Sequence, residues 1–504
     1  MTDLSPRLRA VCDLMVADVR EGAGLHAYDG RVQDLSPSGV RAGLARLGGE
    51  RLDDGHDEAH LAAFEDGLMA TYGDRQRHRT DPLVHAANLD LACYDRAYAP
   101  AADRLAARRA HLEAWPDAVD AAVESLDAVP SPVASALLGA VRGLAAGLSA
   151  SEGAHVQRAL EAHGRFVVHV ERCAREGPAE TAVGAAVLAR EMGSWEGLEV
   201  DTDALTVTAD RERDRLTAML TEACGRLDAT RPASEVVAEL LADHPDAAGV
   251  LDEARALTAE VLEFTAAHAL APWTDGECLV GPAPPSRSWA MAMMSWAAPE
   301  EADAPSSYHV TPPDPSWPAS EIEDWLAVFS RTSLPAITVH EVSPGHYAHG
   351  RALRHAPTLV RRVLHSATFA EGWAHYVEEV MAEEGFRADD PRYVVGLALE
   401  ALVRVTRLAC ALGLHTGAMD VAEATHRFER DAFLGSAAAR SEARRGTFDV
   451  GYGRYTWGKL ALLELRERAR AQWGSGFSLE RYHRALLDLG SPPIGLLDTA
   501  LTRG

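Results

Sequence analysis

The sequence has few cysteines, and none is spaced for a metal site or a disulfide framework. Six cysteines are scattered over 504 residues without a C-x-x-C pair. Thiolate zinc sites and small domains held by disulfides both depend on closer, regular spacing. We therefore expect buried, reduced thiols and neither of these two classes of protein.

The sequence also lacks the long apolar runs of a membrane protein. No run approaches the roughly 18 residues needed to span a bilayer, and the first residues do not show the basic-then-apolar order of a signal peptide. They predict instead an amphipathic helix with Ser5 as its N-cap and Pro6 in its first turn. We expect a cytoplasmic protein without a membrane partner.

Basic side chains are in the minority. The chain carries 49 Lys and Arg against 75 Asp and Glu, a net charge of -26. Such a charge repels a phosphate backbone and makes nucleic acid a poor partner. We interpret the acidic excess as a well-solvated surface, with attraction of cationic substrates as the alternative.

Helical periodicity is what the sequence has in abundance. Residues 1–270 are rich in Ala, Leu, Arg and Glu and indicate successive helices with proline-containing breaks. Residues 271–318 cluster Pro and Trp and favour short strands, whereas helical patterns return over 319–504. We predict a mostly α fold: an N-terminal half that forms the wall of a deep cleft, a small strand-containing insert, and a catalytic half with a metal site.

The segment TVHEVSPGHYAHG contains the only His-Glu pair of the chain, His340 and Glu341. Zinc peptidases commonly place two histidines four residues apart on a helix, with a glutamate after the first as general base. The second histidine, His346, comes six residues after the first, which a regular helix would turn about 120° away. Pro344 and Gly345 lie between them, and this pair disrupts a helix. We predict a break that turns His346 back toward His340.

A candidate third ligand follows about thirty residues later. The segment FAEGWAHYVEEVMAEE predicts a helix with Glu371 near its start. A glutamate from the next helix often completes a two-histidine zinc site and leaves a position for water, although Glu371 could instead be an acid favoured at a helix N-terminus. His375 is an alternative ligand, but a place beside the ligands or at the surface suits it better. We expect His349 and His355 at the surface or lining the cleft.

HEVSPGH and EGWAHY resemble the H-E-x-x-P-G-H and E-G-W-A-x-Y motifs of the family called domain of unknown function 885. Members of that family look like helical zinc peptidases of the gluzincin type. Later segments, such as LGLHTG and YTWGKLALLELRERA, match family blocks in the same order. The resemblance implies one Zn²⁺ ion held by His340, His346 and Glu371, with Glu341 as general base.

The same resemblance makes His415 and Tyr455 candidates for stabilising an oxyanion. The alternative is a hydrogen-bonded core histidine and a buried tyrosine. The chain departs from the family at Ala411, where an aspartate is common. This departure leaves His415 without an expected hydrogen-bond partner.

Four further side chains are candidates for substrate binding. Arg404 and Arg407 could clamp a substrate carboxylate by bidentate pairing, with a structural ion pair as the alternative. Tyr452 could replace Tyr455, because residues three apart share a helical face. Tyr308 lies in the predicted strand SSYHVTP, which could run along the cleft edge and pair with an extended peptide.

Together these residues predict a single-zinc hydrolase of peptide or related amide bonds. Zinc lowers the pKa of a bound water to about 7, and Glu341 can take its proton and deliver it to the leaving nitrogen. One alternative is a metal-dependent hydrolase of a small amide or ester in a biosynthetic pathway. Another is a binding scaffold without turnover. The sequence does not define the substrate, the native metal or the oligomeric state.

Overall fold

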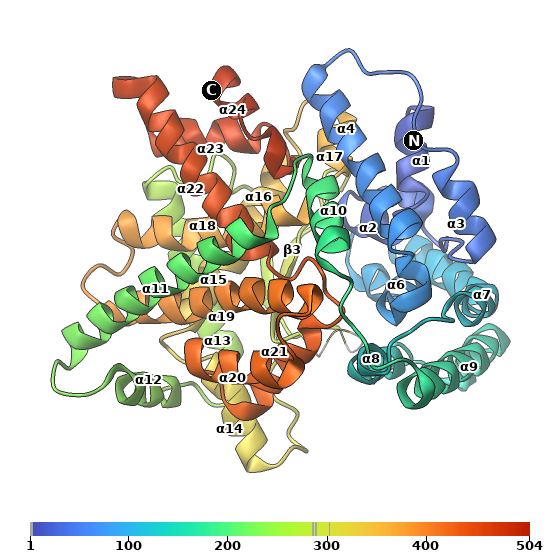
Figure 1. Cartoon of the computed structure of the whole chain (residues 1–504), viewed down its shortest axis with the longest axis horizontal. Helices are drawn as coiled ribbons and strands as arrows, with labels where there is room; N and C mark the ends of the chain where they lie inside the picture. Colours follow the sequence, from blue (N-terminus) through green and yellow to red (C-terminus); the bar gives the residue numbers. More distant parts are fainter. Residues whose placement is uncertain (1–3, 285–286, 288–289, 302) are drawn as a thin grey trace.

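The computed structural model describes residues 4–284, 287, 290–301 and 303–504, and most of them are helical (Figure 1). The predicted mostly α fold is confirmed. Some residues of the predicted insert, at positions 285, 286, 288, 289 and 302, lie outside the described part. Among the described helices, none combines the length and the apolar character that a membrane span requires.

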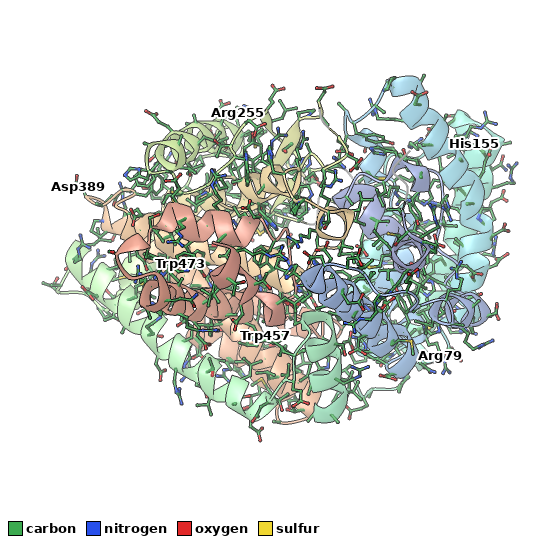
Figure 2. All side chains as sticks on the ribbon, turned by 90° about the horizontal axis from the view of Figure 1, so that it is seen from above. Arg79, His155, Arg255, Asp389, Trp457 and Trp473 are labelled. Carbon is green, nitrogen blue, oxygen red and sulfur yellow. The ribbon has the colours of Figure 1, made fainter. Side chains whose placement is uncertain are left out.

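The first nine helices form one side of the molecule in both Figure 1 and Figure 2. Trp115 and Phe166 belong to one of their cores, and Val11 and Phe64 belong to another. With a π-helical turn, η2 (Met69–Asp74), and short 3-10 turns, the helices are α1 (Pro6–Cys12), α2 (Val16–Gly22), α3 (Pro37–Leu44), α4 (Gly55–Leu68), α5 (Arg77–Thr80), α6 (Pro82–Leu89), α7 (Ala101–Ser125), α8 (Ser131–Gly143) and α9 (Ala154–Glu176).

The start of the chain follows the predicted capping but not the predicted length. Ser5 Oγ accepts a hydrogen bond from the backbone N–H of Leu8, and Pro6 occupies the first helical position. Helix α1 nevertheless ends at Cys12, and α2 begins at Val16. The expected single amphipathic helix is therefore two short ones.

The next four helices precede the insert in sequence but pack on the C-terminal part. They are α10 (Ala185–Glu196), α11 (Thr202–Leu227), α12 (Ala233–Ala242) and α13 (Val250–Ala267). Helix α11 lies along the long helix α19 (Pro391–Thr416), and its Leu216 and Leu220 share a core with Leu402 and Val405 of α19. The division of the chain at residue 270 stays a prediction.

A three-stranded sheet precedes the His-Glu helix, as predicted. Strand β3 (Ser306–Val310) lies between β1 (Cys278–Gly281), which is parallel to it, and β2 (Ala292–Ser295), which is antiparallel. Strand β3 is the predicted segment SSYHVTP without its last two residues. Both of its edges already carry a strand, so the prediction that β3 pairs with a substrate is wrong.

The C-terminal helices surround α18 (Ala367–Glu383). A Cβ on Gly372 of α18 would lie 2.5 Å from Gly458 Cα of α22 (Arg454–Trp473), so the two glycines allow these helices to touch. The remaining helices of this part are α14 (Ala319–Val328), α15 (Leu334–Glu341), α16 (His346–Leu353), α17 (Leu359–Val363), α20 (Val421–Asp431), α21 (Ser436–Gly446), α23 (Leu479–Leu487) and α24 (Thr499–Arg503).

Candidate metal centre

The predicted helix break lies between the two histidines. Helix α15 ends at Glu341, α16 begins at His346, and the Ser343–Pro344 peptide bond between them is cis. A Cβ on Gly345 would lie 1.9 Å from the carbonyl oxygen of His340. Only glycine therefore allows the chain to fold back this closely onto the end of α15.

The break brings three metal-ligand side chains together. His340 Nε2 lies 3.4 Å from Glu371 Oε2, and His346 Nε2 lies 3.3 Å from the same oxygen. One ligand atom from each of the three residues lies within 4.8 Å of the others, and no other such group occurs in the described part of the chain. The imidazole rings stand almost perpendicular, at 88°.

These separations suit a zinc ion. A tetrahedral ion with ligand bonds of about 2.1 Å places its donor atoms about 3.4 Å apart. Two imidazoles and one carboxylate are also a donor set that catalytic zinc sites use. The side chain of Glu371 keeps 24% of its surface exposed, whereas His340 and His346 are nearly covered.

The charges around the donors favour a cation between them. Burial opposes a charge on His340, but Glu371 and Glu378 raise its pKa to about 9. Burial likewise opposes the charge of Glu371, yet both histidines hold its pKa well below the usual range. The carboxylates of Glu371 and Glu378 therefore favour positive charge at this position.

Glu341 lies next to these donors in a different environment. It is the last residue of α15, it is buried, and burial raises its pKa. His346 and His340 act against this shift. A carboxylate with a raised pKa at the edge of a metal site is suited to accept and release protons.

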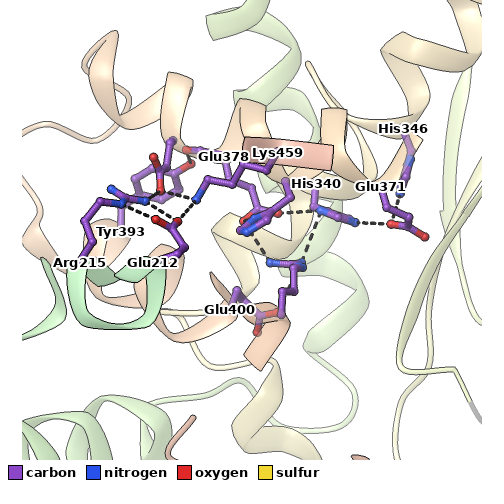
Figure 3. A network of polar contacts seen from close by, with 12 residues as sticks. Glu212, Arg215, His340, His346, Glu371, Glu378, Tyr393, Glu400 and Lys459 are labelled. Carbon is purple, nitrogen blue, oxygen red and sulfur yellow. Dashed lines mark hydrogen bonds and ion pairs between the residues drawn. The ribbon is translucent and has the colours of Figure 1, made fainter. Parts of the chain in front are cut away.

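Glu378 contacts His340 on the side of the ring opposite Glu371, as Figure 3 shows. His340 Nδ1 donates to Glu378 Oε1 at 2.6 Å, which leaves Nε2 directed at the other donors. The second carboxylate oxygen accepts from Arg404 Nη1 at 3.1 Å and from His375 Nδ1 at 3.2 Å. Although burial opposes it, Arg404 and His375 hold the pKa of Glu378 well below its usual range.

Sequence reasoning missed Glu378, although a signal was available. Glu371, His375 and Glu378 are spaced by four and three residues, so they share one face of α18. His375 is fully buried and bonds to Glu378 beside the candidate ligands, which is one of the two places expected for it. His349 is also fully buried, packed near Trp296 and Phe369, so its expected place at the surface or in a cleft is wrong.

The two candidate arginines are already ion-paired. Arg404 is buried between Glu378 and Glu400, and Arg407 makes bidentate contacts of 2.8 and 2.9 Å with Glu442. Figure 3 places Glu400 on the side of this network away from His346. The structural alternative that the sequence left open therefore fits both arginines better than a substrate clamp.

The three candidate tyrosines lie in different surroundings. The Tyr455 ring centre lies 6.4 Å from that of His340, so this tyrosine borders the donors. Tyr452 is fully buried and donates its hydroxyl hydrogen to Glu442. Tyr308 is also fully buried, with its hydroxyl 3.3 Å from Thr338 Oγ1 behind α15. Tyr455 therefore remains the candidate, and the substrate-binding predictions for the other two are not supported.

His415 is not brought to the site. It follows Arg404 by eleven residues on α19, a rise of about 16 Å along a helix. Its ring is buried, and burial lowers its pKa to about 4. The structure therefore does not support the predicted oxyanion role of His415.

Two hollows of the surface lie away from the donors. One borders Phe264 and Phe386, and the other borders Leu414 and Met419. Neither includes a residue of the donor group. The deep cleft at the metal site stays a prediction.

Comparison with known proteins identifies a family and a fold. The family described as "Bacterial protein of unknown function (DUF885)" matches residues 19–501. No curated protein matches the chain. A "putative lipoprotein of unknown function" from Shewanella oneidensis has the same fold, with a TM-score of 0.75, 20% identity and 97% of each chain covered. A similarly described lipoprotein from Colwellia psychrerythraea gives a TM-score of 0.76 at 17% identity, covering 98% of this chain and 97% of that one.

Proposed function

Because the chain belongs to the DUF885 family, whose description names no activity, we propose its function from its own side chains: metal-dependent hydrolysis of peptide or related amide bonds. The observation that carries the proposal is the convergence of His340, His346 and Glu371 across a helix break. The donor separations and donor types fit one Zn²⁺ ion. Gluzincin-like chemistry, with glutamate as third ligand, is the finer form of this proposal.

Each residue of the site has a distinct part. His340, His346 and Glu371 would hold the ion, and Glu378 keeps His340 in the tautomer that offers Nε2. A zinc ion bound at this site polarises a carbonyl and lowers the pKa of water. Glu341 is then placed to accept a proton from the attacking water.

Proton transfer through Glu341 completes the cycle. Burial raises the pKa of Glu341, which favours the protonated form that would carry the same proton to the leaving nitrogen. The Tyr455 hydroxyl is the candidate donor to the oxyanion that forms at the carbonyl. In this proposal Glu341 serves as both base and acid, and Tyr455 serves as the oxyanion donor.

The decisive experiment combines metal analysis with peptide hydrolysis. We expect one zinc ion per chain in the purified protein, and we expect Glu341→Gln to keep that zinc. Hydrolysis of a mixture of short peptides should fall at least about a hundred-fold in this variant, the range of general acid–base catalysis. Glu384→Gln, an exposed glutamate beyond the end of α18, is the matched control and should change neither quantity.

The outcomes distinguish the proposal from its rivals. Unchanged peptide turnover by Glu341→Gln would refute the mechanism. Hydrolysis of N-acyl amino acids or esters but not of peptides would favour the small-molecule hydrolase. A protein that neither contains nor takes up zinc, and hydrolyses nothing, would favour a binding scaffold. The cytoplasmic location stays a prediction, since the two proteins of similar fold are described as lipoproteins.

A further inference from the structure

Tyr455 borders the metal donors on one side and arginines on the other. The guanidinium carbon of Arg407 lies 5.2 Å from the centre of its ring, and that of Arg454 lies 5.9 Å away. Arg445 covers the neighbouring ring of Tyr452 at 4.7 Å. Three helices, α19, α21 and α22, thus direct a guanidinium group toward these two tyrosines.

Of these three arginines, Arg445 makes the weakest contact with a carboxylate. Arg407 pairs with Glu442 in the bidentate arrangement described above, and Tyr452 donates to the same carboxylate. Asp449 is shared: Arg454 pairs with both of its oxygens, whereas Arg445 Nη2 reaches one of them at only 3.4 Å. Asp449 is therefore engaged mainly by Arg454, and the other carboxylate on which Arg445 acts, Glu442, is engaged by Arg407.

On the other side of the site, carboxylates outnumber arginines. There, Arg404 is shared by two carboxylates, Glu378 and Glu400. Arg77 of the N-terminal part also acts on Asp449, but Arg77 has its own partner, Asp81, at 2.8 Å. The loosely paired positive charge on this side of the site is therefore that of Arg445.

Both arginines keep part of their side-chain surface exposed. The side chain of Arg445 keeps 36% of its surface exposed and that of Arg454 keeps 21%, although Tyr452 beneath them is fully buried. On a chain with a net charge of -26, a group of three arginines around two tyrosines is unusual. An accessible cation pair beside a tyrosine at a metal site is an arrangement that attracts and orients an anion.

We propose that Arg445 and Arg454 bind the free C-terminal carboxylate of a short peptide substrate. The inference rests on the proposed hydrolase function and adds the substrate class: peptides that end near the scissile bond. An extended chain spans about 3.5 Å per residue, so a substrate held at the metal and reaching past the Tyr455 ring would end about two residues beyond the cleaved amide. Guanidinium groups suit this role because their planar donors match a carboxylate.

The first test compares a short peptide acid with its C-terminal amide. We expect the protein to hydrolyse the acid at least about ten-fold faster, measured as kcat/KM. Arg445→Gln should lower kcat/KM for the acid by about ten- to a hundred-fold and leave that for the amide unchanged. Arg444→Gln, an exposed arginine beside it on α21, is the matched charge control and should preserve the preference for the acid.

A second peptide pair identifies the source of the carboxylate. One amide ends in aspartate and the other in asparagine. We expect similar kcat/KM values for these two, because the proposed subsite receives the C-terminus. A strong preference for the aspartyl amide would overturn that assignment in favour of an acidic side chain, and equal rates for the acid and the amide of the first pair would overturn the subsite itself.

A binding measurement keeps this inference separate from the hydrolase proposal. Calorimetric titration of zinc-loaded Glu341→Gln with N-acetyl-leucyl-leucine and with its amide needs no turnover. We expect tighter binding of the acid, a difference that Arg445→Gln removes and Arg445→Lys partly restores. Equal affinities, or no binding of the acid, would overturn the inference even if the protein proved to be a peptidase. Unchanged zinc content and thermal midpoint would show that Arg445→Gln has not simply damaged the fold.

Discussion

Two adjacent glutamates on α18, Glu378 and Glu379, belong to two buried polar networks of different kinds. Figure 3 shows Glu378 in one of them and Lys459, Glu212 and Arg215 in the other. Glu378 faces the metal donors, and Glu379 faces away from them toward Lys459, which donates to it at 2.5 Å. The Glu379 network also contains Glu212 and Arg215 of α11. It has two positive and two negative groups, and each is in contact with a partner of opposite charge.

The difference between the networks indicates their roles. Lys459 is the only lysine in the chain, and its side chain has no exposed surface. Its contacts with Glu212 and Glu379 join the three helices α11, α18 and α22. The Glu378 network instead ends at three donor atoms that face one another, one of them on the partly exposed Glu371. A closed and neutral network is suited to holding helices together. A network that ends in converging donor atoms is suited to metal binding.

The largest expected effect comes from breaking the closed network. Lys459→Met removes the central cation and leaves Glu379 and Glu212 in a buried position with only Arg215 to balance them. Removing one partner of a buried pair costs about 3 to 5 kcal/mol. Urea unfolding should show this loss, and calorimetry should show unchanged zinc affinity. A variant of normal stability would contradict the structural interpretation of Lys459.

Acid should weaken the same network more gradually. Burial opposes the charge of Glu379, but Lys459 and Arg215 lower its pKa to about 2. Because the pKa is lower in the folded state, Glu379 contributes stability that is complete above about pH 4.5 and is lost as the pH falls toward 2. The free energy of unfolding, measured between these limits, should fall less steeply in Glu379→Gln than in the unchanged protein. Parallel curves would show that Glu379 does not titrate as proposed.

Neighbouring substitutions on α18 compare the two networks directly. Glu378→Gln weakens the support of His340, so zinc affinity should fall about ten- to a hundred-fold. Glu379→Gln should leave zinc affinity unchanged and lower stability. Competition with a chelator measures the first quantity, and urea unfolding measures the second. Equal losses of zinc affinity in both variants would mean that the networks are not separate.

The sequence could supply the elements and the donors but not these pairings. Helical periodicity predicted the mostly α fold, and the Pro344–Gly345 pair predicted the break that turns His346 toward His340. Both are local effects, because they depend on residues within one or two helical turns. The three-residue donor group followed from these local patterns and from motif resemblance.

Long-range partners were beyond such reasoning. Lys459 and Glu212 are 247 residues apart, and only the packing of α11 and α22 brings them together. For Arg407 the sequence left a substrate clamp and a structural ion pair open, because its partner Glu442 lies on another helix. Strand order was equally hidden, so β3 was expected to have an open edge. The sequence pattern of a segment shows which side chains share a face, but it does not show which residues that face contacts.

The smallest expected effect concerns the outer edge of the closed network. Arg215 keeps 43% of its side-chain surface exposed, so water screens its pairing with Glu212 and Glu379. Arg215→Ala should therefore cost at most about 1 kcal/mol of unfolding free energy, because Lys459 still neutralises the buried acids. A larger loss, comparable to that of Lys459→Met, would show that the network depends on its exposed member as much as on its buried one. Unchanged zinc affinity in both variants would still keep the closed network distinct from the candidate metal centre.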